Sequence, residues 1–129
     1  MSRVPPRCAR TMGEVRAGVD AVDRALIALL AERFAYMDAA ARIKDSRAAI
    51  RDEARKREVI GNVCREAAAY GLDAAFVAEL WDRLVEASIA HEYRAWDRQR
   101  RGSGEGAASG CDGSGCGQER ERTGTGWRE

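Results

Sequence analysis

The fold of this chain is decided by residues 12–44, MGEVRAGVDAVDRALIALLAERFAYMDAAARIK. Apolar residues recur there at intervals of three and four, which is the spacing of one face of an α-helix. The stripe comprises Val15, Val19, Val22, Leu26, Leu29, Leu30, Phe34 and Met37. The sequence therefore predicts one helix about 50 Å long, at roughly 1.5 Å per residue, with a continuous apolar face to bury.

Three cations lie along this predicted helix, at Arg16, Arg33 and Lys44. Arg33 and Lys44 are about 16 Å apart along the axis and return to nearly the same side, so they can close on one small anion. Arg16 lies about 25 Å from Arg33, too far to join that pair within its own chain. If two such helices pair antiparallel about a midpoint near Ala28, Arg16 of one chain falls beside position 40 of the other. We therefore expect a three-cation pocket shared by two chains, against the alternative of solvated cations in weak surface ion pairs.

The remaining pattern predicts two further helices and no strand. Asp52 suits a helix start, and the second helix runs to about Tyr70, where Gly71 ends it. Asp73 can cap a third helix over residues 75–100. Its stripe carries Phe76, Val77, Leu80, Leu84, Val85, Ser88, Ile89 and Trp96. The fold class is therefore all-α, a three-helix chain with a long first helix. Because such a helix overhangs so small a bundle, we expect an intertwined homodimer.

Composition divides the chain into three parts: an N-terminal arm over residues 1–11, a helical domain over 12–101 and a tail over 102–129. The tail holds 9 of the 13 glycines, so we expect it to be disordered. Residues 1–101 carry 19 Lys and Arg against 16 Asp and Glu, with both signs interspersed, which does not suggest a nucleic-acid partner.

Targeting signals and metal motifs are absent from the sequence pattern. No apolar run reaches the roughly 18 residues of a membrane-spanning helix, and the N-terminus lacks the apolar core of a secretion signal, so we expect a cytoplasmic protein without a membrane partner. Cys8, Cys64, Cys111 and Cys116 show no close CxxC pairing, and we expect free thiols. A soft-metal site or a disulfide at Cys111 and Cys116 is the alternative.

Two polar pairs add to the three cations. Asp52 and Arg55 are three residues apart, and Ser88 and Glu92 are four apart, so each pair shares a helix face. The segments EVRAGVDAVDRALIALLAERF, RIKDSRAAIRDEARKRE and LVEASIAHE resemble those of the all-helical chorismate mutases, which form intertwined dimers of three-helix chains. The resemblance covers about residues 12–98.

The resemblance implies substrate-binding roles at seven positions: Arg16, Arg33, Lys44, Asp52, Arg55, Ser88 and Glu92. Arg16 reaches in from the partner chain and binds the two substrate carboxylates together with Arg33 and Arg55. Lys44 holds a carboxylate and the ether oxygen. Asp52 lies near the ring hydroxyl, and the last two residues contact the carboxylate and ether region. A dicarboxylate suits such a site, because guanidinium groups bind carboxylates bidentately.

The implied reaction is the rearrangement of chorismate to prephenate in aromatic amino-acid biosynthesis. It needs no nucleophile, metal or redox cofactor, and Lys44, Glu92 and Arg33 are the implied catalytic residues. The sequence departs from parts of the family at two positions. Glu92 replaces a glutamine of one branch and can donate to the ether oxygen only when protonated. Lys56 replaces a glutamate that helps some mutases to bind the ring hydroxyl.

Two other functions remain open. The stretches AAARIKDSRAAI and YGLDAAFV also resemble the isochorismate pyruvate lyases, relatives on the same fold, although Asp52, Arg55 and Ser88 match the mutases better. A non-catalytic helical dimerisation module is the second alternative. Buried cations without protein counter-ions favour the enzyme, and full pairing favours the module. We expect His91 to be packed or solvated rather than a general base, and Trp81 and Trp96 to serve packing.

Overall fold

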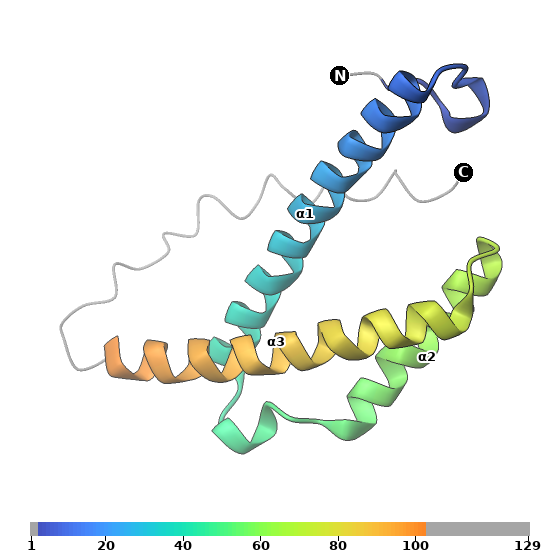
Figure 1. Cartoon of the computed structure of the whole chain (residues 1–129). Helices are drawn as coiled ribbons and strands as arrows, with labels where there is room; N and C mark the ends of the chain where they lie inside the picture. The colour runs from blue at the N-terminus through green and yellow to red at the C-terminus, as the bar shows by residue number, and fades with distance from the viewer. Residues whose placement is uncertain (1–2, 103–129) are drawn as a thin grey trace, which may run out of the picture.

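The computed structural model describes residues 3–102, and this part of the chain is helical and without strands. The elements in order are η1 (Pro6–Cys8), α1 (Met12–Ile43), η2 (Arg47–Ala49), α2 (Glu53–Ala69) and α3 (Ala74–Gly102), as Figure 1 shows. The predicted three-helix, all-α chain is confirmed. The predicted tail lies outside the described residues apart from Gly102, which ends α3.

Helix α1 begins and ends where local chemistry dictates. The Thr11 hydroxyl accepts a hydrogen bond from the Glu14 backbone N–H at 3.1 Å, which caps the first turn. Lys44 has extended backbone angles, φ −63° and ψ 142°, so the helix ends at Ile43, one residue earlier than predicted. Lys44 is therefore the first residue of the connector between α1 and α2, residues 44–52, rather than the last of the helix.

Helices α2 and α3 form a hairpin with a tight turn. The Asp52 carboxylate accepts from the Arg55 N–H at 3.0 Å and caps α2, as predicted. Gly71 has φ 73°, a left-handed conformation that glycine adopts at no steric cost. The Asp73 carboxylate accepts from the Ala75 N–H at 3.0 Å. Helix α3 begins one residue before the predicted range and ends two residues after it.

Helix α3 lies against both other helices, and the small core is built around it (Figure 1). The buried cluster joins Ile50 of the connector to Val85 and Ile89 of α3. Partly buried apolar side chains surround it: Val59, Trp81, Tyr93 and Trp96. The expected packing role of the two tryptophans is confirmed. Among the described cysteines, Cys8 and Cys64 are free thiols, while the other two lie outside the described residues.

The first half of α1 extends away from α3 (Figure 1). Four side chains of the apolar stripe on this half, and Leu29 just beyond it, are between 39% and 54% exposed: Val15, Val19, Val22, Leu26 and Leu29. Phe76 and Leu80, predicted on the packed stripe of α3, are also 60% and 46% exposed. The polar contacts of α1 fall on residues 88–100 of α3, so α1 does not cover these two side chains. None of the helices in residues 3–102 combines the length and apolar character needed to cross a membrane.

Candidate functional site

A pocket of about 340 Å³ lies where the second half of α1, the connector and the start of α2 meet the middle of α3. Six of the seven predicted site residues line it: Arg33, Lys44, Asp52, Arg55, Ser88 and Glu92. The apolar part of the wall includes Met37, Ile50, Val59, Val85 and Ile89. Arg16 does not join them, because it is exposed on the first half of α1. One chain therefore assembles most of the predicted site.

Arg33 is a half-buried cation in the pocket wall. Its Nη1 donates to Ser88 Oγ at 2.5 Å, and Ser88 Oγ donates to the Leu84 carbonyl oxygen at 2.7 Å. Burial, and then the charge of Arg55, lower the pKa of Arg33. No carboxylate within residues 3–102 pairs with this guanidinium. The arrangement leaves a positive charge that an external anion can neutralise.

Lys44 and Glu92 form the second part of the site. Glu92 Oε1 lies 2.7 Å from Lys44 Nζ, and the side chains are 4% and 30% exposed respectively. Oε1 has no hydrogen bond of good geometry with residues 3–102, so the ion pair is its partner there. A buried carboxylate is costly unless it is neutralised or bonded. The ammonium of Lys44 therefore offsets the Glu92 charge, so this carboxylate has little need of a further hydrogen-bond donor inside the pocket.

The first turn of α2 supplies Asp52 and Arg55. The Asp52 carboxylate caps the helix, which fixes its position at the pocket wall. Arg55 Nη1 lies 3.0 Å from Glu58 Oε2, and both side chains are 61% exposed. Such an exposed pair contributes little to stability. Arg55 can therefore exchange this partner for a ligand carboxylate at small cost.

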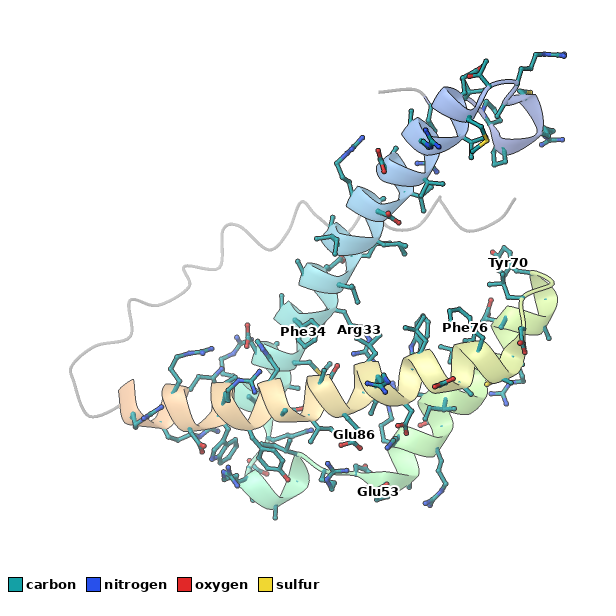
Figure 2. All side chains as sticks on the ribbon, viewed as in Figure 1. Arg33, Phe34, Glu53, Tyr70, Phe76 and Glu86 are labelled. Carbon is teal, nitrogen blue, oxygen red and sulfur yellow. The ribbon has the colours of Figure 1, made fainter. Side chains whose placement is uncertain are left out.

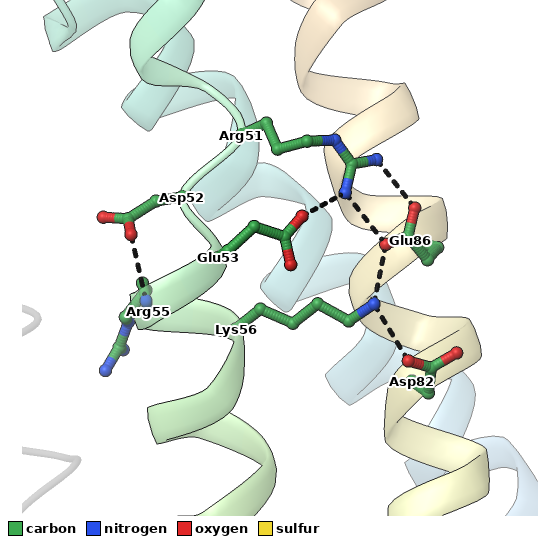
Figure 3. Close-up of polar contacts among 7 residues, drawn as sticks. All are labelled: Arg51, Asp52, Glu53, Arg55, Lys56, Asp82 and Glu86. Atoms are coloured by element: carbon green, nitrogen blue, oxygen red, sulfur yellow. Dashed lines mark hydrogen bonds and ion pairs between the residues drawn. The ribbon is translucent and has the colours of Figure 1, made fainter.

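Lys56 also lines the pocket, but its ammonium is held by α3 (Figure 3). Its Nζ lies 2.8 Å from Glu86 Oε1 and 2.9 Å from Asp82 Oδ1. Arg51 binds the same Glu86 at 2.8 Å. These contacts raise the pKa of Lys56 and, with the Arg51 hydrogen bond as the largest cause, lower the pKa of Glu86 to about 2. The sequence identified Lys56 as a departure and missed its carboxylate partners, whose four-residue spacing was the available signal.

His91 lies outside the pocket lining, in agreement with its predicted structural role. Its Nε2 lies 2.7 Å from Asp38 Oδ1, and its ring meets the Phe34 ring edge-on, 5.0 Å between the centroids. The aspartate partner was not predicted. His91 therefore links α3 to α1 outside the pocket lining.

The family profile of chorismate mutase type II matches residues 15–93, a span that contains all seven predicted site residues. The chain belongs to the chorismate mutase type II family. An isochorismate pyruvate lyase of Pseudomonas aeruginosa is 34% identical over 92 residues, which cover 71% of this chain and 90% of that protein. The resemblance seen in the sequence is confirmed, and both findings support an enzyme of the chorismate-utilising group.

Proposed function

We propose that this chain is a chorismate mutase, which rearranges chorismate to prephenate. The observation that carries the proposal is Arg33, a half-buried guanidinium that binds a neutral serine and has no carboxylate partner within residues 3–102. A dicarboxylate ligand supplies the missing charge and matches the guanidinium fork. Such an unpaired cation also argues against a purely structural dimerisation module, in which we expect full pairing.

In the proposed reaction the cations hold the substrate and stabilise its transition state. Arg33 and Arg55 bind the two carboxylates and keep the enolpyruvyl arm folded over the ring in a reactive geometry. Lys44 offsets the negative charge that grows on the ether oxygen as the carbon–oxygen bond breaks. Neither action needs a nucleophile.

The polar residues of α2 and α3 complete the proposed site. Ser88, oriented by Leu84 and Arg33, contacts the carboxylate region. Protonated Glu92 donates to the ether oxygen, while Asp52 faces the ring hydroxyl. Glu92 is buried beside Lys44. With a proton it can donate a hydrogen bond to the ether oxygen, and without one its negative charge opposes the charge that develops there.

We also propose that two chains form an intertwined homodimer and that Arg16 of one chain completes the pocket of the other. The uncovered stripe on the first half of α1 supports this arrangement, because an exposed apolar face of that length is unfavourable in water. Arg16 lies on the same half of the helix. A partner helix covering the stripe therefore brings its own Arg16 toward a pocket already rich in cations.

Isochorismate pyruvate lyase activity is the second candidate, because the Pseudomonas relative carries that name. The two reactions give different products from different substrates, so a pair of assays, one for each substrate, separates them. Purified full-length protein is supplied with chorismate, with prephenate measured, and separately with isochorismate, with salicylate and pyruvate measured.

We expect faster formation of prephenate, and its loss in Arg33→Ala. Arg83→Ala, which removes an exposed arginine of α3 outside the pocket, is the matched control and keeps the wild-type rate. Turnover of isochorismate alone makes the chain a lyase. Turnover of neither substrate by correctly folded protein supports the non-catalytic module.

A further inference from the structure

Arg100 of α3 lies outside the pocket lining and donates hydrogen bonds to the backbone at the end of α1. Arg100 Nη1 donates to the Ala41 carbonyl oxygen at 2.9 Å, and Nη2 donates to the Lys44 carbonyl oxygen at 3.3 Å. The Ala41 carbonyl is among the last four of α1, which have no N–H partner within a helix. Arg100 therefore caps α1 from a neighbouring helix.

The guanidinium of Arg100 is itself held in place. Its central carbon lies 3.3 Å from the centre of the Trp96 ring, one helical turn back along α3. A stacked, planar guanidinium loses less freedom on binding two acceptors than a flexible ammonium does. Its positive charge also lies at the negative end of the α1 dipole. Both effects stabilise the two hydrogen bonds from Arg100 to the Ala41 and Lys44 carbonyl oxygens, which we call the Arg100 clasp.

The clasp bears on the site through Lys44. This residue is the first after α1, with extended backbone, and its side chain reaches Glu92 Oε1 at 2.7 Å. Helix α3 thus holds Lys44 at two points, the carbonyl oxygen through Arg100 and the ammonium through Glu92. A lysine side chain is long and flexible, so the place of its ammonium depends on where its backbone is anchored. Helix ends fray when nothing anchors them.

We propose that Arg100 is a positioning residue, which keeps the Lys44 ammonium at the ether-oxygen end of the pocket by fixing the Lys44 backbone. The catalytic consequence rests on the proposed function. The positional consequence does not, because it concerns the geometry of the free protein. Arg100 does not line the pocket, so we expect its effect to reach the ligand through the Lys44 backbone.

The kinetic test is a double-mutant cycle between Arg100→Gln and Lys44→Met. We expect Arg100→Gln to lower kcat about tenfold with a smaller change in KM, within the roughly 10²-fold that a 1 Å displacement can cost. In the Lys44→Met background the same change has no further effect, because the group it positions is gone. Arg94→Gln, which removes an exposed arginine of α3 outside the pocket, is the control and leaves kcat unchanged.

The second measurement needs no activity. The chain has two lysines, Lys44 and Lys56, so protein labelled with 13C at the lysine ε-carbon gives two side-chain signals by NMR. Lys56→Arg assigns them. We expect Arg100→Gln to shift the Lys44 signal and leave the Lys56 signal in place, and Arg100→Lys, which has no fork for two carbonyls, to give an intermediate shift.

The outcomes separate the two proposals. An unshifted Lys44 signal in folded Arg100→Gln, or a fall in kcat that persists in full in the Lys44→Met background, overturns the positioning role. Absence of activity in wild-type protein with a shifted Lys44 signal overturns the proposed function alone. Circular dichroism of each variant shows whether the total helix content is retained.

Discussion

Two groups of charged side chains lie on opposite sides of α3 and differ in how they are paired. On the α2 side, the outer network of Arg51, Lys56, Asp82 and Glu86 gives each cation two carboxylates within 2.9 Å, Arg51 using Glu53 as its second (Figure 3). On the α1 side, the pocket cluster of Arg33, Lys44, Ser88 and Glu92 has two cations for one carboxylate. Figure 2 shows Arg33 and Glu86 on these two sides of α3.

The pKa directions reflect this difference. In the outer network the carboxylates raise the pKa of Arg51 and Lys56, and the cations lower that of Glu86. In the pocket cluster, burial and a neighbouring cation lower the pKa of Arg33. The outer charges therefore favour the folded chain, while burial disfavours the Arg33 charge. This difference supports the proposed binding role of the pocket cluster, and it predicts that the outer network contributes to stability.

The largest expected effect separates the two lysines. Lys44→Met should lower turnover by about 10² to 10³, the cost of one lost transition-state donor. Lys56→Met keeps the stem that lines the wall and removes an ammonium already held by Glu86 and Asp82, so turnover changes far less. Steady-state kinetics of both variants measure the contrast. Equal losses from the two changes contradict the functional distinction between the clusters.

The second test asks whether the pocket cluster is completed by Arg16 of another chain. Arg16→Ala and Lys44→Met should each be inactive, and refolding them together should restore about a quarter of the sites. Half of randomly paired dimers are mixed, and each holds one intact pocket of two. Mixed dimers, verified by differently tagged chains, that remain inactive rule out the shared site.

Sequence reasoning succeeded where short-range chemistry decides the structure. The caps at Asp52 and Asp73 and the turn at Gly71 follow from residue type, and the helices lie within two residues of the predicted bounds. Six of the predicted site residues line one pocket, because helical spacing and the family resemblance agree on which faces converge.

The contacts that the sequence did not predict depend on the relative position and rotation of two packed helices. The partners of Lys56, the Asp38 contact of His91 and the Arg100 clasp all require the relative positions of helices far apart in sequence. Spacing within one helix carries no such information. The exposed Phe76 has the same origin, since the spacing of a stripe does not say which part of it another helix covers.

The third test uses the one carboxylate of the pocket cluster. Only a Glu92 that carries a proton can donate to the ether oxygen. Glu92→Gln supplies a permanent donor of nearly the same shape and should keep turnover at or above the wild-type level, whereas Glu92→Ala supplies no donor and should lower it. The kcat values are compared under conditions where chemistry limits the rate.

Glu79→Gln, a change at an exposed position of α3 outside the pocket, is the control and keeps the wild-type kcat. If Glu92→Gln and Glu92→Ala lower kcat equally, Glu92 is not the donor.

The smallest expected effect belongs to the outer network. The pKa of Glu86 falls from 4.5 to about 2 on folding, so its ionised form stabilises the chain above about pH 4.5. That contribution is lost as pH drops from about 4.5 toward 2. Glu86→Gln should lower the Tm slightly at neutral pH, with the difference from wild type disappearing in acid, and turnover should stay at the wild-type level. A Tm difference that is constant over this pH range contradicts the network's role.

The packing of α1 determines how late this helix finds its partner while the chain is being synthesised. Helix α1 is synthesised first, yet the helix it mainly packs against, α3, is synthesised last, and their hydrogen bonds join residues 53 to 61 positions apart. The hairpin of α2 and α3 closes over shorter separations, with contacts 10 to 35 residues apart, so we expect it to fold first. On the ribosome, α1 is therefore an amphipathic helix without a partner until α3 emerges. Proteolysis of stalled nascent chains tests this expectation, since the second half of α1 should become protected only after residue 102 has left the exit tunnel.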